Sequence, residues 1–115
     1  MSYGDWDVIL KEYQEFYLKN PKTSELVVGI LKIIPFLREK SSFFGLTPGT
    51  SHETLFLEAP HKKNRIYVSY QKDFYTLYLM NPATDIIVEE TRVPYDIIIT
   101  TITDYIMKLL SNELD

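Results

Sequence analysis

The spacing of apolar and polar positions in the first third of the chain predicts two helices. Asp5 has the side chain of an N-cap, and we expect a helix over residues 5–19. Its apolar face, at the i, i+3, i+4, i+7 spacing, consists of Trp6, Ile9, Leu10, Tyr13, Phe16 and Tyr17. A second helix is expected to start at Asn20 and Pro21, and to end or kink at Pro35. Its apolar stripe consists of Leu26, Val27, Ile30, Leu31 and Ile34.

The middle of the chain changes to short runs that are rich in β-branched and aromatic residues and bounded by turn residues, which predicts strands. The expected strands cover residues 43–44, 54–59, 65–71, 74–80 and 86–93. Apolar and polar residues alternate in the third of these runs, with Ile66, Val68 and Tyr70 on one side and Arg65, Tyr67, Ser69 and Gln71 on the other. This alternation predicts an antiparallel sheet that is covered on one face. Short turns at 72–73 and 81–85 predict that the last three strands form a meander.

A third helix, opened by Pro94, has the strongest pattern in the chain. Its apolar face consists of Tyr95, Ile98, Ile99, Ile102, Tyr105, Ile106, Leu109 and Leu110. The β-branched residues in this segment lower its helix propensity, so a strand over 96–101 is the rival interpretation. The whole pattern predicts one α+β domain over residues 1–115. It has two N-terminal helices, an antiparallel meander of three to five strands and a C-terminal amphipathic helix, with the helices on one face of the sheet.

Composition and charge narrow the classes of function. The chain has 115 residues, 45% of them hydrophobic, which is ordinary for one globular domain. Sixteen acidic residues against twelve Lys and Arg give a net charge of -4, which disfavours a polyanionic partner. The lack of cysteine excludes disulfides, thiol catalysis and thiolate metal sites. The N-terminus does not resemble a signal peptide and the apolar stretch at 26–37 is too short to span a bilayer, so we expect a cytoplasmic protein without a membrane partner.

Sequence motifs for catalysis or metal binding are missing. His52 and His61 flank the predicted strand at 54–59, about 30 Å apart along an extended chain, so we expect no shared metal, and no cofactor is expected either. No nucleophile elbow and no phosphate-binding glycine motif occurs. The segment 45–52 is rich in glycine and hydroxyl groups, and its Thr-Pro-Gly run at 47–49 predicts a type II turn. A small hydrolase or ligand-binding domain with its site in this segment is one alternative function.

The excess of tyrosine, nine residues in this chain, is the most informative feature. The helical stripes place Tyr13, Tyr17, Tyr95 and Tyr105 in the core. The strand tyrosines remain, and Tyr75 and Tyr78, three apart, are expected on opposite faces of their strand. We predict that an exposed sheet face binds a partner through Arg65, Tyr67, Tyr75 and Tyr78, with a second patch formed by Phe43, Phe44 and His52.

The function expected from these features is a non-enzymatic, protein-binding module. Small acidic α+β chains of this kind include inhibitors, immunity proteins, antitoxins and chaperones. The bound molecule is a protein partner or a second copy of the chain, and Asp85, Glu89 and Glu90 are expected to steer a basic partner. A second alternative is a single-stranded nucleic-acid binder that uses Tyr67, Tyr75, Lys62, Lys63 and Arg65. The negative net charge and the absence of the aromatic ribonucleoprotein motif disfavour it.

Overall fold

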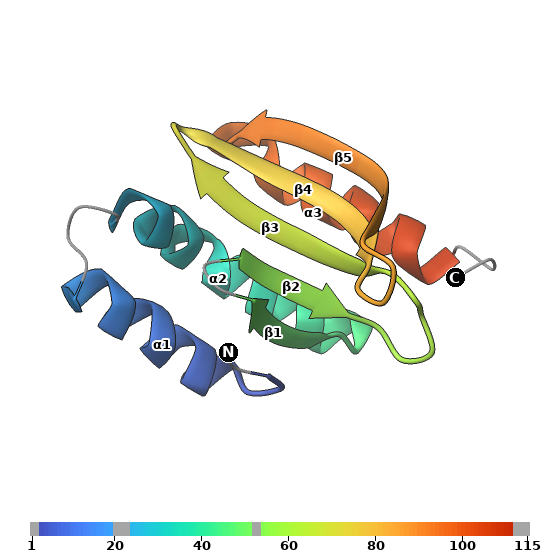
Figure 1. The fold of residues 1–115 in the computed structure, drawn as a ribbon, viewed down its shortest axis with the longest axis horizontal. Coiled ribbons are helices and arrows are strands. Elements are labelled where there is room, and N and C mark those ends of the chain that lie inside the picture. Colours follow the sequence, from blue (N-terminus) through green and yellow to red (C-terminus); the bar gives the residue numbers. More distant parts are fainter. Residues whose placement is uncertain (1–2, 20–23, 52–53, 112–115) are drawn as a thin grey trace.

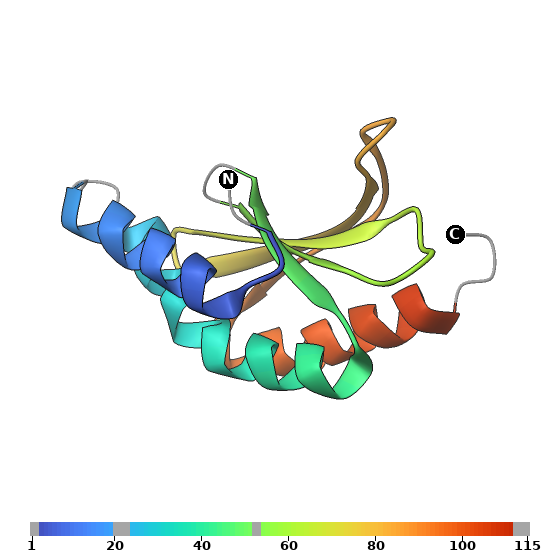
Figure 2. The same ribbon diagram turned by 90° about the horizontal axis from the view of Figure 1, so that it is seen from below.

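The computed structural model describes residues 3–19, 24–51 and 54–111. Along the chain the elements are α1 (Trp6–Lys19), α2 (Ser24–Phe44), β1 (Thr47–Ser51), β2 (Thr54–Glu58), β3 (Arg65–Gln71), β4 (Phe74–Asn81), β5 (Ile86–Pro94) and α3 (Tyr95–Ser111). The five strands are antiparallel and lie in the order β1-β2-β3-β4-β5. Helices α2 and α3 lie under one face of the sheet, and α1 lies beside α2 (Figures 1 and 2). This arrangement confirms the predicted α+β class.

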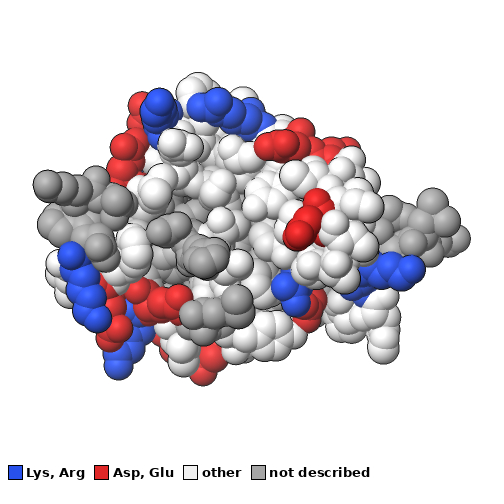
Figure 3. Space-filling view, viewed as in Figure 1, with Lys and Arg blue, Asp and Glu red and all other residues white. Residues whose placement is uncertain are grey.

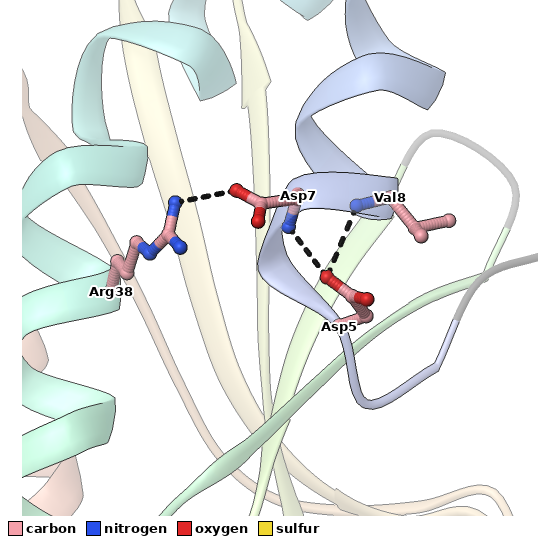
Figure 4. A network of polar contacts seen from close by, with 4 residues as sticks. All are labelled: Asp5, Asp7, Val8 and Arg38. Atoms are coloured by element: carbon pink, nitrogen blue, oxygen red, sulfur yellow. Dashed lines mark hydrogen bonds and ion pairs between the residues drawn. The ribbon is translucent and has the colours of Figure 1, made fainter.

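The N-terminal helix begins where the sequence predicts. The Asp5 carboxylate accepts hydrogen bonds from the backbone N–H groups of Asp7 and Val8, at 2.8 and 3.3 Å, which is N-cap geometry (Figure 4). Asp7 also forms an ion pair with Arg38 of α2, 3.0 Å long and exposed to solvent. Ile9 and Tyr13 are buried in the core as expected.

Helix α2 is longer than predicted, since it continues through Pro35 and ends at Phe44. The strand expected at 43–44 is therefore wrong. Proline in a helix removes one backbone hydrogen bond, at a cost of about 3 kcal/mol. That cost is offset because Ile34 and Leu37, on either side of the exposed Pro35, are buried against the core. The expected start of this helix, at Asn20 and Pro21, lies outside the described residues.

The Thr-Pro-Gly run at 47–49, expected to form a type II turn, is part of the edge strand β1, which pairs with β2 from Thr47 opposite Glu58 to Ser51 opposite Thr54. Pro48 fits here because an edge strand tolerates a missing N–H group. Gly49 leaves room for the ring of Phe56 on β2, since a Cβ at Gly49 would come within 2.2 Å of that ring. The turn prediction was wrong because Gly49 is required here by its contact with Phe56 of the neighbouring strand, and local sequence does not show that contact.

The core lies between the sheet and the helices, and two tyrosine hydroxyls are anchored within it. The Tyr75 hydroxyl donates to the carbonyl oxygen of Gly29 in α2 at 2.7 Å, and the Tyr105 hydroxyl of α3 donates to Thr91 Oγ1 at 2.6 Å. The segment 96–101 is helical, which excludes the rival strand interpretation. Tyr17 and Tyr95, which we expected in the core, are about 40% exposed. No helix within the described ranges is long and apolar enough to cross a bilayer.

Candidate functional site

The face of the sheet opposite α2 and α3, which we call the open face, carries a row of aromatic side chains. The strand registers place Phe56 of β2 opposite Tyr67 of β3, and Tyr67 opposite Tyr78 of β4. The ring centroids are 5.7 Å apart in the first pair and 5.0 Å apart in the second, where the rings are stacked with an interplanar angle of 6°. Tyr3 adds a fourth ring, 6.4 Å from Phe56. The row is therefore held in place by ring contacts before any partner arrives.

One end of the aromatic row is bordered by a half-buried ion pair. Arg65 donates to one carboxylate oxygen of Glu58 through Nε and Nη2, both at 2.8 Å, and its guanidinium lies 4.2 Å from the centroid of Phe56. Burial lowers the pKa of Arg65, but hydrogen bonds with Tyr67 and Glu58 raise it more. The hydroxyl of Tyr3 donates to the other oxygen of Glu58. The charge of Arg65 is thus compensated within the chain.

A pocket of about 370 Å³ opens beside this row on the open face. Its lining consists of Ser51, Thr54, Phe56, Arg65, Tyr67, Tyr78, Met80, Pro82 and Asp85. Two of these residues come from the β4–β5 turn, which rises from the sheet beyond the strands (Figure 2). The turn is well defined, because the N–H groups of Thr84 and Asp85 donate to the carbonyl oxygen of Asn81, and that of Ala83 donates to the Asn81 side chain. The pocket therefore has one wall of strand side chains and one wall of turn.

Asp85 is the acidic group of the pocket. Its backbone φ of 59° lies in the left-handed region, which Asp and Asn tolerate better than most residues. Among the described residues, its carboxylate forms no hydrogen bond or ion pair. Tyr78 also lines the pocket, and burial, followed by the influence of Tyr67, raises the pKa of its hydroxyl. Tyr78 therefore stays neutral at physiological pH, and the pocket pairs an uncompensated carboxylate with uncharged aromatic rings.

Charged side chains surround the open face rather than fill it. Figure 3 looks onto this face and shows mainly uncharged residues in the middle, apart from the area that grey residues cover; most acidic and basic side chains lie near the rim, and one acidic side chain lies within the right half of the face. The open face therefore has a largely uncharged centre, with most of its charges near its border.

The predicted binding residues separate into several places. Arg65, Tyr67 and Tyr78 meet on the open face and line the pocket together. Tyr67 is only 4% exposed, because the Phe56 and Tyr78 rings flank it, so Tyr78 presents more of its ring to the pocket. Tyr75 does not belong to this site. Its side chain points toward α2 and is fully buried, so the prediction that it faces a partner is wrong.

The second predicted patch is not continuous with the first. Phe43 and Phe44 lie at the end of α2, in the helix layer behind the sheet, with their rings 4.8 Å apart. Phe43 is 81% exposed, and the two rings line a separate hollow with Glu39 and Lys40. His52 lies outside the described residues.

Four pocket residues were in none of the predicted sites, namely Thr54, Phe56, Met80 and Pro82, and Ser51 was included only as part of the alternative segment 45–52. Phe56 stands between two leucines, so its strand shows no alternation that would assign a face to it. Met80 shares the open face with Tyr78 by strand period alone, and that signal was available. Ser51 and Thr54 reach the pocket because the β1–β2 pair brings them to the same end of the sheet.

The segment 45–52, the alternative place for a ligand, has little room for one. The side chain of Thr50 is buried and its hydroxyl donates to Glu12 of α1 at 3.2 Å, while the ring of Phe56 covers Gly49. Within the described ranges, no group of three His, Asp or Glu side chains is placed to hold a metal ion. The pocket on the open face is therefore the better candidate for a site.

No family model, curated protein or solved structure matches the chain.

Proposed function

We propose that this protein is a non-enzymatic, protein-binding module whose open sheet face receives a basic side chain of a partner. The observation that carries the proposal is the pocket of about 370 Å³, which combines stacked aromatic rings with the carboxylate of Asp85. The hydroxyl groups of Ser51 and Thr54 line it, but among the described residues no His or carboxylate is hydrogen-bonded to either of them, so binding is the activity that its chemistry supports best.

The aromatic row favours a protein surface as the bound molecule. Tyrosine and phenylalanine supply large contact areas, and the stacked Tyr67 and Tyr78 rings lose little further freedom when a partner arrives. Tyr78 is partly exposed, so part of its ring or its hydroxyl can contact a partner. Such prepared aromatic groups are typical of the residues that contribute most to binding energy in protein interfaces.

The charges of the pocket favour a Lys or Arg side chain. The Glu58 carboxylate already compensates Arg65, whereas Asp85 has no ionic partner among the described residues. A cation in the pocket would contact Asp85 and the exposed part of the Tyr78 ring, so ionic and cation–π attraction would add. The net charge of -4 would also speed the approach of a basic partner.

The nucleic-acid alternative has weaker support. Its central cation, Arg65, is engaged by Glu58, Tyr67 and Phe56, so it would have to give up those contacts to bind a phosphate. The pocket would also place the Asp85 carboxylate close to a polyanion, which is repulsive.

The first test is a titration of the ¹⁵N-labelled protein with Nα-acetyl-arginine amide, followed by NMR. We expect shifts at Tyr78, Met80 and Asp85 and a dissociation constant of about 1 mM, since one ion pair and one cation–π contact together contribute about 4 kcal/mol. The neutral analogue with citrulline in place of arginine should bind at least about tenfold more weakly. Equal binding of both analogues would contradict a cation pocket.

Matched variants make this test specific. Asp85→Asn keeps the left-handed turn residue and removes its charge, while Asp73→Asn makes the same change at another left-handed position, φ 70°, in the β3–β4 turn away from the pocket. Asp85→Asn should abolish the shifts, and Asp73→Asn should leave them unchanged. With a basic protein partner, Tyr78→Ala should also reduce binding. If neither Asp85→Asn nor Tyr78→Ala affects partner binding, the open face is not the binding surface.

A further inference from the structure

The two edge strands of the sheet, β1 and β5, differ in the backbone pairing on their outer sides. At the β1 edge, the N-terminal segment adds a bridge from Tyr3 to Gly49, and the Gly4 N–H donates to the Pro48 carbonyl oxygen at 2.8 Å. At the other edge, β5 pairs with β4 on one side, and no segment in the described part of the chain pairs with its outer side. An edge of nine residues with unpaired backbone groups is a template for another strand.

The apolar residues of β5 also lack cover. Ile86, Ile87 and Val88 follow one another at the start of the strand and are 62%, 48% and 57% exposed. Directly after the strand, Tyr95 begins α3 and is 40% exposed. Three adjacent exposed apolar residues on an edge strand are unusual in a monomer, because sheet edges are normally protected by charge, proline or a covering segment.

Two opposite charges stand two residues apart on the open side of β5. Glu90 lies opposite Tyr78 and Arg92 opposite Thr76, so both point to the open face. Both are exposed, and neither forms an ion pair with any of the described residues. Glu89, on the helix side, is different, because it is held by Lys108 at 2.6 Å.

An antiparallel pair of identical strands must be centred on a residue, since residues directly opposite one another point to the same face. Centring on Glu89, Glu90 or Arg92 would place that charged residue opposite its own copy, which is repulsive. Centring on Thr91 instead places each Glu90 opposite the Arg92 of the other copy, twice by symmetry. Among these four centres, the charges of β5 therefore favour Thr91.

We propose that β5 pairs with β5 of a second copy of this chain, in the antiparallel register centred on Thr91. The two five-stranded sheets then form one continuous sheet, with two Glu90–Arg92 contacts on its open side. Beyond the end of this pairing, the exposed apolar residues Ile87 and Val88 of each copy approach Pro94 of the other copy, without direct residue pairs. The register shift that β5 shows at Val88 limits the regular ladder to residues 89–93 of each copy.

The test is the molar mass in solution, measured by light scattering and by sedimentation at concentrations up to about 500 μM. We expect the wild-type protein to approach twice 13.5 kDa as its concentration rises. Glu90→Arg and Arg92→Glu should each weaken the dimer by about tenfold or more, since each replaces two attractive contacts with two repulsive ones. Mixing the two variants should restore association as a heterodimer. One strand then carries arginine at both positions and the other carries glutamate at both, so each contact again joins opposite charges.

Control variants separate this effect from general ones. Glu15→Arg makes the same charge change on an exposed position of α1 and should leave the dimer unchanged. Glu90→Gln and Arg92→Gln remove the attraction without adding repulsion and should weaken the dimer less than the charge reversals. Circular dichroism checks that each variant is folded. Asp85→Asn should not change the mass, since Asp85 is not in the paired ladder.

A wild-type protein that stays at 13.5 kDa over the whole concentration range would overturn the proposal. So would a dimer that neither single variant weakens, because another surface would then form it. Loss of the dimer in both variants without its return on mixing would overturn the register centred on Thr91.

Discussion

On the helix side of the sheet, the Tyr75 hydroxyl is buried and donates to a backbone carbonyl oxygen of α2. On the open side, Tyr67 and Tyr78 stack on one another across β3 and β4, and Tyr78 keeps part of its surface exposed. Tyr75 and Tyr78 are in the same strand, three positions apart, and their surroundings give them different tasks. A tyrosine whose hydroxyl is satisfied inside the protein stabilises the fold, whereas one that keeps an accessible ring is available to a partner.

The largest difference between the two faces is expected when two neighbouring side chains of β4 that point to opposite faces are truncated. Leu77→Ala removes a fully buried side chain between the sheet and the helices. It should lower the free energy of unfolding by about 3 kcal/mol, because it leaves a cavity. Tyr78→Ala removes a partly exposed ring and should cost less, about 1–2 kcal/mol from lost burial and lost stacking with Tyr67, and should reduce binding in the pocket. Urea unfolding measures both effects, and equal losses of stability would contradict the difference between the faces.

The contact between α2 and the sheet should be almost as sensitive. Gly29 lies against the ring of Tyr70, where an added Cβ would come within 2.2 Å of ring carbons. Gly29→Ala should therefore destabilise the protein by about 1–3 kcal/mol through overpacking, although alanine is the better helix former. Val28→Ala, at the neighbouring exposed position, is the control and should change stability by less than about 1 kcal/mol. A Gly29→Ala protein as stable as the wild type would mean that Tyr70 can move aside.

Removing single hydroxyl groups gives a finer comparison. Tyr75→Phe should cost about 1 kcal/mol, because the buried carbonyl oxygen of Gly29 loses its side-chain donor. Tyr78→Phe, on the open face, should change stability by less than about 0.5 kcal/mol. Thermal unfolding at pH 7 measures the difference, and a larger loss for Tyr78→Phe would reverse our assignment of structural and binding tyrosines.

The same hydroxyls predict how stability depends on pH. Burial raises the pKa of Tyr75 well above its usual value, and burial also raises that of Tyr105. An unfolded tyrosine loses its proton near pH 10, where the folded protein still holds it. The free energy of unfolding should therefore be constant from pH 7 to about pH 9 and fall as the pH rises above about 10. Urea unfolding across this range tests it, and Tyr75→Phe should make the fall less steep.

The smallest effect is expected away from both faces, at the exposed ion pair of Asp7 and Arg38. Arg38→Ala should change the free energy of unfolding by less than about 0.5 kcal/mol, because solvent screens the pair and its side chains lose freedom in forming it. A loss above about 1 kcal/mol, measured by urea unfolding, would show that α1 depends on this contact to remain against α2.

The sequence by itself determined the α+β class, the N-cap at Asp5, the meander and the faces of β3, because these follow from local periodicity and turn chemistry. Tertiary structure decided the rest. Pro35 stays within α2 because its neighbours Ile34 and Leu37 are buried in the core. The segment 47–51 is a strand in which Gly49 accommodates the ring of Phe56 on β2. The pocket could not be predicted, since it joins side chains from four strands and a turn that are far apart in the chain. Period 2 indicates which side a tyrosine faces, but only packing determines whether helices or solvent lie there.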